Sequence, residues 1–218
     1  MPHHFSQLAV ALDDYLARHP EEGEAVAGFQ QFLASHEAVF ERSHPVGHFT
    51  GSAWLVSADG ERVLLTHHAK LRRWLQLGGH ADGDADLARV ALREAEEESG
   101  LRALTVEQAI FDIDRHRIPV RGDEPEHWHY DVRYVLRATG SEAYAISEES
   151  LALAWKPVRE IAADPQADDS LRRMARKWLA RSPLQERLQP RRSCICSTVI
   201  AAEAAPTVAP ARSVPAPG

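Results

Sequence analysis

At 218 residues the chain is long enough to bury the core of one domain, and its length does not favour a second full domain. Apolar residues make up 44% and charged residues 26%, as is ordinary for a globular protein, and Lys+Arg 25 against Asp+Glu 32 gives a net charge of -7. An acidic chain is poorly suited to broad electrostatic binding of nucleic acid or anionic membrane, so neither partner is expected. A local basic pocket or a metal ion would still allow it to bind a polyanionic small molecule.

Neither a membrane anchor nor a signal peptide is expected. The sequence has no run of about 18 apolar residues that could span a bilayer. Its start, Met1–Phe5, lacks the basic and then apolar pattern of a signal peptide, which predicts a cytoplasmic protein. The two cysteines, Cys194 and Cys196, lie close together near the C-terminus, so neither a disulfide framework nor a zinc ribbon is indicated.

Two helices are predicted before residue 47. Apolar residues recur at helical spacing over Phe5–Arg18 and again over Glu21–Phe40, and His19-Pro20 interrupts the pattern between them. We expect residues 1–46 to form a helical extension packed on the core, where it braces the sheet or contributes to a homodimer contact.

From Gly47 onward the pattern becomes that of short strands alternating with helices. Apolar runs bounded by turn residues predict strands at Phe49–Val56, Arg62–Thr66, Trp74–Leu77, Leu104–Ile113, His127–Leu136 and Leu151–Trp155. Helical spacing predicts helices at Asp86–Ser99, Val158–Ala163 and Asp169–Ala180. The first of these helices follows a glycine-rich loop at 78–84, has Asp84 or Asp86 as its N-cap, and stops at Gly100.

This order of elements predicts an α/β protein in which helices cover both faces of one mixed sheet, an α/β/α sandwich over residues 47–181. Beyond residue 182 the chain is rich in Pro, Ala, Arg and Ser and has few large apolar residues. Such a composition cannot build a core, so residues 182–218 are predicted to be a disordered tail.

Three glutamates of the helix predicted at 86–99 carry the chemistry. Glu94, Glu97 and Glu98 stand at positions i, i+3 and i+4, so their side chains project from one face. Like charges this close repel, so a cation is the natural reason to hold them there, and hard oxygen ligands select Mg²⁺ or Mn²⁺. A solvated acidic surface is the alternative interpretation. The preceding glycine-rich loop favours a metal site, because its amides and the helix start can hold a phosphate.

The same segment resembles the Nudix box, which is written Gly, five residues, Glu, seven residues, Arg-Glu-apolar-any-Glu-Glu-any-Gly-apolar. The positions that match in register are Gly79, Arg93, Glu94, Ala95, Glu97, Glu98, Gly100 and Leu101. One position departs, because the first glutamate of the box falls on Ala85. Either neighbouring aspartate, Asp84 or Asp86, could substitute for it through a shifted loop.

The resemblance implies a Nudix-type fold and a Mg²⁺-dependent hydrolase that cleaves a phosphoanhydride bond, in a nucleoside diphosphate linked to another moiety or in a related compound. Glu97 and Glu98 would be the principal metal ligands, and Glu94 would be a ligand or the general base. Gly79 would offer its carbonyl to the metal. Arg93 would orient a glutamate, and Gly100 would have a structural role in the box.

A loop after the box is a second place for the general base in this family. Here the candidates are Glu148 and Glu149, just before the last predicted strand. A pair of solvated loop glutamates is the alternative interpretation.

The histidine-rich segment His127–Tyr134 alternates, so that its two faces differ. Trp128, Tyr130, Val132 and Tyr134 fall on one face, and His127, His129, Asp131 and Arg133 fall on the other. The polar face either is simply exposed or lines the substrate cleft, with Arg133 on a phosphate and His129 or His116 at the leaving group. His80, next to Gly79, is another candidate for substrate contact. Zinc binding by His116, His127 and His129 is a minor alternative, because no cysteine supports it.

Two competing functions share this fold. An isoprenoid diphosphate isomerase relies on a cysteine inside the domain, and none precedes Cys194, which disfavours it. A catalytically silent nucleotide-binding or regulatory module is disfavoured by the retained Glu94, Glu97 and Glu98. The choice of substrate is made by loops outside the box, so the sequence does not name the substrate.

Overall fold

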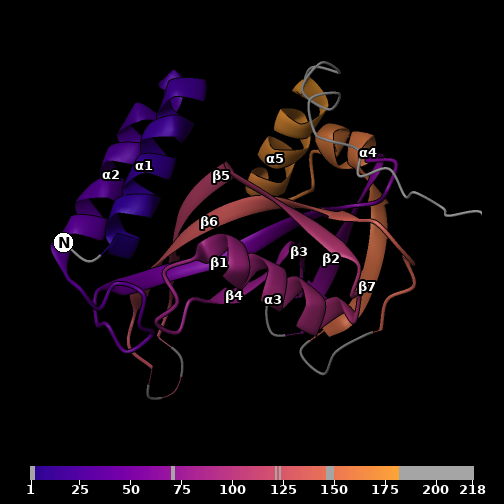
Figure 1. Cartoon of the computed structure of the whole chain (residues 1–218). Helices are drawn as coiled ribbons and strands as arrows, with labels where there is room; N and C mark the ends of the chain where they lie inside the picture. Colours follow the sequence, from indigo (N-terminus) through magenta and orange to yellow (C-terminus); the bar gives the residue numbers. More distant parts are fainter. Residues whose placement is uncertain (1–2, 70–71, 121, 123, 146–149, 182–218) are drawn as a thin grey trace, which may run out of the picture. The chain divides into compact units, whose positions relative to one another are not determined.

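The computed structural model describes residues 3–69, 72–120, 122, 124–145 and 150–181 of the chain (Figure 1). The predicted disordered tail at 182–218, which contains Cys194 and Cys196, lies outside the described residues. So do the two loop candidates for the general base, Glu148 and Glu149. Within the described part, none of the helices is long and apolar enough to cross a membrane.

The N-terminal segment contains the two predicted helices, α1 (His3–Arg18) and α2 (Gly23–Ser35), joined by a short 3-10 helix, η1 (Pro20–Glu22). Their buried apolar side chains belong to the same core as strand side chains; they are Leu8, Leu12, Tyr15, Val26, Phe29, Phe32 and Leu33. The stacked rings of Phe32 and Tyr130, with centroids 3.8 Å apart, show how α2 joins the sheet.

The prediction that the second helix continues to Phe40 is wrong. The helix ends at Ser35, and His36 is already extended. The carbonyl of Val39 accepts the N–H of Phe49 at 2.8 Å, and the carbonyl of Phe40 accepts the N–H of Gly83 at 2.9 Å. The chain therefore leaves the helix after Ser35, and these two carbonyls anchor the first strand and the box loop.

One mixed sheet occupies the centre of the described chain (Figure 1). Its strands are β1 (Gly47–Val56), β2 (Arg62–His68), β3 (Trp74–Leu75), β4 (Leu77–His80), β5 (Leu104–Ile118), β6 (His127–Ala138) and β7 (Ser150–Pro157). The order is β3-β2-β1-β6-β5, with β4 paired to β1 and β7 paired to β2. Strands β1 and β6 are parallel, and the other pairs are antiparallel.

Helices cover both faces of the sheet, which confirms the predicted α/β/α arrangement. Successive residues of a strand point to opposite faces. Phe49, Ala53 and Leu55 of β1 pack in a core with α2 and with α3 (Leu87–Ser99). Trp54 and Val56 pack in a second core with α4 (Val158–Ala163) and α5 (Asp169–Ala180). In Figure 1, α3 and the pair α4 and α5 accordingly lie on opposite sides of the strands.

Two strand predictions need correction. The strand expected at Trp74–Leu77 is divided into β3 and β4, and β4 continues through Gly78-Gly79-His80, which were expected in a loop. Pairing with Thr50, Gly51, Ser52 and Ala53 of β1 holds these glycines in the sheet. Strand β5 extends to Ile118 rather than ending at Ile113, because β6 pairs with it along that whole length.

Candidate active site

Helix α3 begins and ends where its capping residues predict. The carboxylate of Asp86 accepts the backbone N–H of Arg89 at 3.1 Å, which satisfies a donor at the helix start. Gly100 has φ 72° and donates its N–H to the carbonyl of Glu96, so the helix stops after Ser99. Gly51 lets the helix lie close to β1, since a Cβ there would come within 2.7 Å of the Leu87 carbonyl.

The glutamates of α3 meet the two glycines of β4. The carboxylate of Glu98 accepts the N–H of Gly78 at 2.8 Å. Gly79 lies against Glu94 so closely that a Cβ at residue 79 would stand 2.4 Å from the Glu94 carboxylate. Glu97 lies between them in the sequence and is exposed. The structure therefore brings together Glu94, Glu98 and the Gly78-Gly79 backbone, with Glu97 on the same helix face.

Arg93 orients Glu94. Its guanidinium donates to Oε1 of Glu94 at 2.8 Å and to the carbonyl of His80 at 2.9 Å. Burial raises the pKa of the Glu94 carboxyl, and the hydrogen bond and charge of Arg93 oppose that rise. Glu94 is therefore a half-buried carboxylate that is fixed in direction and has a stronger affinity for a proton than an exposed glutamate.

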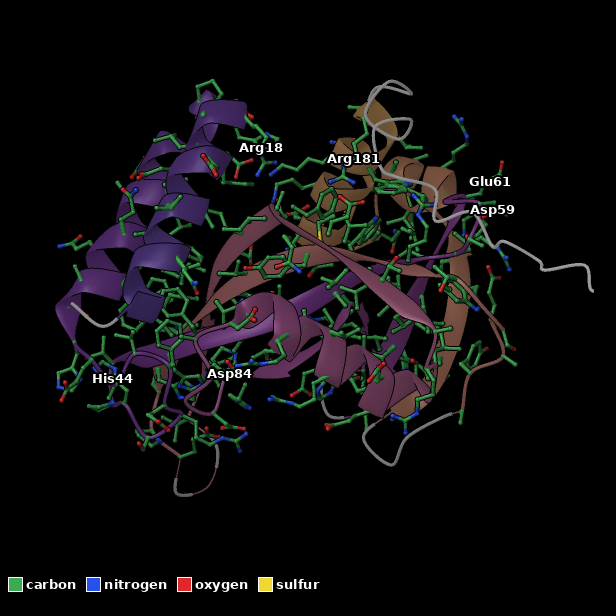
Figure 2. All side chains as sticks on the ribbon, viewed as in Figure 1. Arg18, His44, Asp59, Glu61, Asp84 and Arg181 are labelled. Atoms are coloured by element: carbon green, nitrogen blue, oxygen red, sulfur yellow. The ribbon has the colours of Figure 1, made fainter. Side chains whose placement is uncertain are left out.

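The two aspartates that flank Ala85 have different roles. Asp84 lies between β4 and α3 (Figure 2) and accepts from Arg89 at 2.6 and 2.8 Å. That hydrogen bond is the main cause that lowers the pKa of Asp84. Asp86 caps the helix. Arg93 donates to Glu94 and to the His80 carbonyl, while Asp84 and Asp86 bond elsewhere, so the two aspartates do not jointly take one glutamate's place.

The donor set of this site suits a hard divalent cation. It comprises the carboxylates of Glu94, Glu97 and Glu98 and the backbone carbonyl of Gly79, and oxygen ligands of this kind are what Mg²⁺ and Mn²⁺ take. The glycine at 79 lets the Glu94 carboxylate pack directly against the backbone, at a place where any Cβ would overlap with it. These residues therefore fit the metal that the box implies.

The three predicted substrate-binding residues, His80, His129 and Arg133, lie on the opposite face of the sheet. His80 alternates with Gly79 along β4, and it pairs with Thr50 of β1, which faces away from α3. His129 pairs with His48 across the parallel strands and so shares that face. The rings of His80 and His129 lie with centroids 5.2 Å apart.

Arg133 lies on the same face but is enclosed. Its side chain is 2% exposed, and it donates to Asp131 at 2.7 Å and to Asp112 at 3.0 Å. The charges of these aspartates keep its pKa high against the effect of burial. The structure thus places Arg133 in an internal ion-pair network, and the phosphate contact that the sequence suggested would require those pairs to open.

Sequence reasoning missed two residues that the structure makes prominent, His48 and Asp112. Each is buried, and each meets its partners through strand pairing. His48 adjoins His129 because β1 and β6 are parallel, and Asp112 adjoins Arg133 because β5 and β6 are antiparallel. Alternation within each strand indicated which face a residue occupies. The pairing register between strands that are distant in the chain could not be predicted from the sequence.

Comparison with known proteins identifies the family. A family model described as NUDIX domain matches residues 48–178, which is more than half of the chain. The chain therefore belongs to the Nudix family. A search of curated proteins gave no match.

Several solved structures are similar in fold. A NUDIX family hydrolase from Clostridium perfringens has 22% identity and a TM-score of 0.46, over 60% of this chain and 95% of that chain. An Ap4A hydrolase from C. elegans, in a binary complex, has 16% identity and a TM-score of 0.49, over 61% and 95%. The E. coli dihydroneopterin triphosphate pyrophosphohydrolase has 16% identity and a TM-score of 0.47, over 59% and 92%. At these identities the comparison concerns the fold and not the substrate.

Proposed function

We propose that the chain is a Mg²⁺-dependent hydrolase that cleaves a phosphoanhydride bond, in a nucleoside diphosphate linked to another moiety or in a related compound. The observation that carries the proposal is the convergence of Glu94 and Glu98 on the Gly78-Gly79 backbone, with Glu97 on the same helix face. Such a cluster concentrates negative charge beside the backbone of two glycines. Membership of a family of hydrolases supports the same reaction class.

Each group in the cluster has a distinct task. Glu97, Glu98 and the Gly79 carbonyl would hold Mg²⁺, or Mn²⁺ in its place, with Glu94 as a further ligand or as the general base. When bound, the ion neutralises charge on the phosphate oxygens and lowers the pKa of a coordinated water. Arg93 keeps the Glu94 carboxylate aimed at Gly79 through its 2.8 Å hydrogen bond. Asp86 and Gly100 fix both ends of the helix that carries the glutamates.

The proton of the attacking water goes to a carboxylate. As the water oxygen bonds to phosphorus, the bond between phosphorus and the bridging oxygen breaks, and the leaving phosphate keeps its electron pair. Glu94 is our candidate for the base, because it is half-buried, oriented by Arg93 and has a raised pKa. Glu148 and Glu149 are the alternative bases. His80 stays a candidate for substrate contact, although its side chain lies on the sheet face away from α3.

The test is turnover of a substrate panel by the purified chain in Mg²⁺. The panel contains nucleoside triphosphates, dinucleotides, nucleotide sugars and prenyl diphosphates, with products identified by mass. The variant Glu97→Gln/Glu98→Gln is compared with Glu96→Gln, a glutamate of the same helix outside the cluster. We expect cleavage that is lost in the double variant and in chelator but kept in Glu96→Gln.

The outcomes separate the competing functions. Nucleotide binding without turnover of any compound would contradict hydrolysis and favour a silent regulatory module. A product that is an isomer of a prenyl diphosphate, with unchanged mass, would contradict hydrolysis and favour an isomerase. Product masses from a cleaved compound locate the bond that was attacked and name the substrate class.

A further inference from the structure

Histidines from four strands gather on the sheet face away from α3. They are His48 of β1, His80 of β4, His116 of β5, and His127 and His129 of β6. His48 is at the centre. Its ring centroid lies 4.7 Å from that of His129, 4.9 Å from His80 and 5.0 Å from His127.

Strand pairing fixes this gathering. His48 stands opposite His129 in the parallel pair of β1 and β6, and His116 stands opposite His129 in the antiparallel pair of β5 and β6. His80 stands opposite Thr50 of β1. Thr50 follows His48 by two residues, so both side chains, and that of His80, are on the same face of the sheet. The rings therefore project from rigid backbone, which suits a preorganised site better than loop residues would.

The central ring lacks the hydrogen bonds that a buried imidazole needs. His48 is 1% exposed, and among the described residues neither its Nδ1 nor its Nε2 has a hydrogen-bond partner. Leaving a buried polar group unpaired is costly, so such groups are rare without a ligand or a function. A coordinated ion is one way to satisfy a nitrogen of this ring.

We propose that His48, His80 and His129 form a second metal site, separate from the glutamate cluster, that takes a borderline transition ion such as Zn²⁺. Each of the three residues offers one nitrogen, and these nitrogens lie within 4.8 Å of one another. Nitrogen ligands around a tetrahedral zinc at about 2.0–2.1 Å are about 3.3 Å apart, so small ring movements complete the site. Three histidines leave a fourth position for water or a phosphate oxygen.

The surroundings keep the histidine rings neutral, as a metal ion requires of its ligands. Burial, aided by the neighbouring histidines, lowers the pKa of His48 to about 3 and that of His129 to about 2. His127 contacts the carbonyl of Pro125 through Nδ1 at 2.9 Å, and its Nε2 lies 3.3 Å from Nε2 of His129. A contact of this kind orients a ligating ring. His80 and His129 are only half-buried, which gives an ion a path to His48.

Arg42 must leave His80 when the ion binds. It donates to Nδ1 of His80 at 2.9 Å, and a neutral ring that accepts there carries its proton on Nε2. Coordination needs a lone pair, so either the ion replaces Arg42 at Nδ1 or the proton moves to Nδ1 and the hydrogen bond breaks. Arg42 is exposed and keeps Asp82 as a partner at 2.9 Å, so its release costs little.

The test is Co²⁺ binding by the full chain, freed of metal by chelator and held in excess Mg²⁺ so that the glutamates are occupied. A tetrahedral nitrogen site gives Co²⁺ intense visible absorption, whereas an octahedral oxygen site gives it weak absorption. The variants are His48→Asn, His80→Asn and His129→Asn. Controls are His67→Asn, a half-buried strand histidine outside the group, and Glu97→Gln/Glu98→Gln.

We expect one equivalent of Co²⁺ with intense absorption, displaced by Zn²⁺. Affinity should fall more than about tenfold in each cluster variant and stay unchanged in both controls. Weak absorption in the wild type, or affinity that the cluster variants do not change, would overturn the proposal. If circular dichroism shows that His48→Asn does not fold, the half-buried His80 supplies the deciding variant. Because this readout is independent of turnover, it stands or falls separately from the proposed hydrolysis.

Discussion

The carboxylate of Glu94 owes its place to the missing side chain at Gly79. A Cβ there would stand 2.4 Å from that carboxylate, so any other residue must push Glu94 away. Because the group that yields is the end of a flexible side chain, the cost to the fold is small while the cost to the site is large. The packing of Glu94 on this box glycine is thus separate from the metal contact that we propose for its backbone carbonyl.

Gly79→Ala should therefore lower turnover without lowering the stability of the fold. We expect more than about a tenfold loss of Mg²⁺-dependent turnover, in line with the effect of a misplaced catalytic group, with little change in urea unfolding. The matched control is Gly28→Ala, where an added Cβ meets nothing within 4 Å inside α2. This control should stabilise by about 0.5–1 kcal/mol and leave turnover unchanged. Full activity in Gly79→Ala would contradict the assigned packing.

At the residue scale, what the sequence could predict depended on how local each contact is. Glu94, Glu97 and Glu98 share one helix, so their spacing alone placed them on one face. His48 and Arg133 meet partners on other strands, and the hydrogen bond from Thr50 to Asp131 joins residues 81 apart in the chain. Burial of a polar residue is likewise decided by such partners, which is why the enclosure of Arg133 was not foreseen.

At the scale of single elements, helix α3 is defined by its caps. Asp86 accepts at the first turn, and Gly100 takes the left-handed conformation at the end. Both boundaries were predicted, because capping depends on neighbours in the chain. The end of α2 and the strand at Gly78-Gly79-His80 were not, because carbonyl partners in β1 and the box loop override local preference there.

Asp86→Ala should lower the free energy of unfolding by about 1 kcal/mol through loss of the N-cap. The measurement is urea denaturation followed by circular dichroism. Asp86→Asn, which keeps a side-chain oxygen as cap, should recover most of that loss. A variant Asp86→Ala as stable as the wild type would show that the cap does not contribute.

At the scale of the whole described unit, a buried ion network joins the N-terminal and C-terminal helices to the sheet. Asp112 of β5 is fully buried and accepts from Arg133 at 3.0 Å, from Arg173 at 2.8 Å and from Lys177 at 2.7 Å. Lys177 of α5 also contacts Glu22 of η1 at 2.5 Å. Elements distant in the chain therefore depend on one carboxylate.

Asp112→Asn should be strongly destabilising, by about 3–5 kcal/mol, because it leaves buried cations without their charge partner. Glu126→Gln removes an exposed partner of Arg117 and serves as control, with an expected cost below about 1 kcal/mol. Urea unfolding of both variants measures the difference. Equal, small effects would show that the network is not a main source of stability.

The network also makes the stability of the fold decrease as the pH falls. Burial acts to raise the pKa of Asp114, but the hydrogen bond with His116 and the charges of Arg133 and Arg173 hold it well below the ordinary 3.8. The unfolded chain then binds a proton that the folded chain does not, so stability is present above about pH 3.8 and is lost as pH falls below it. Asp114→Asn should show a flatter decline in urea unfolding between pH 7 and pH 3, and an equally steep decline would contradict this assignment.

The central claim, that the α3 glutamates hold a divalent cation, is tested most directly by Mn²⁺ binding followed by electron paramagnetic resonance, which needs no substrate. Titration of Mn²⁺ into the wild type should suppress the signal of the free ion. Glu96→Gln should behave as the wild type does, and Glu97→Gln/Glu98→Gln should leave the free signal intact. Suppression of equal strength in the double variant and the wild type would contradict the assignment of the metal to these glutamates.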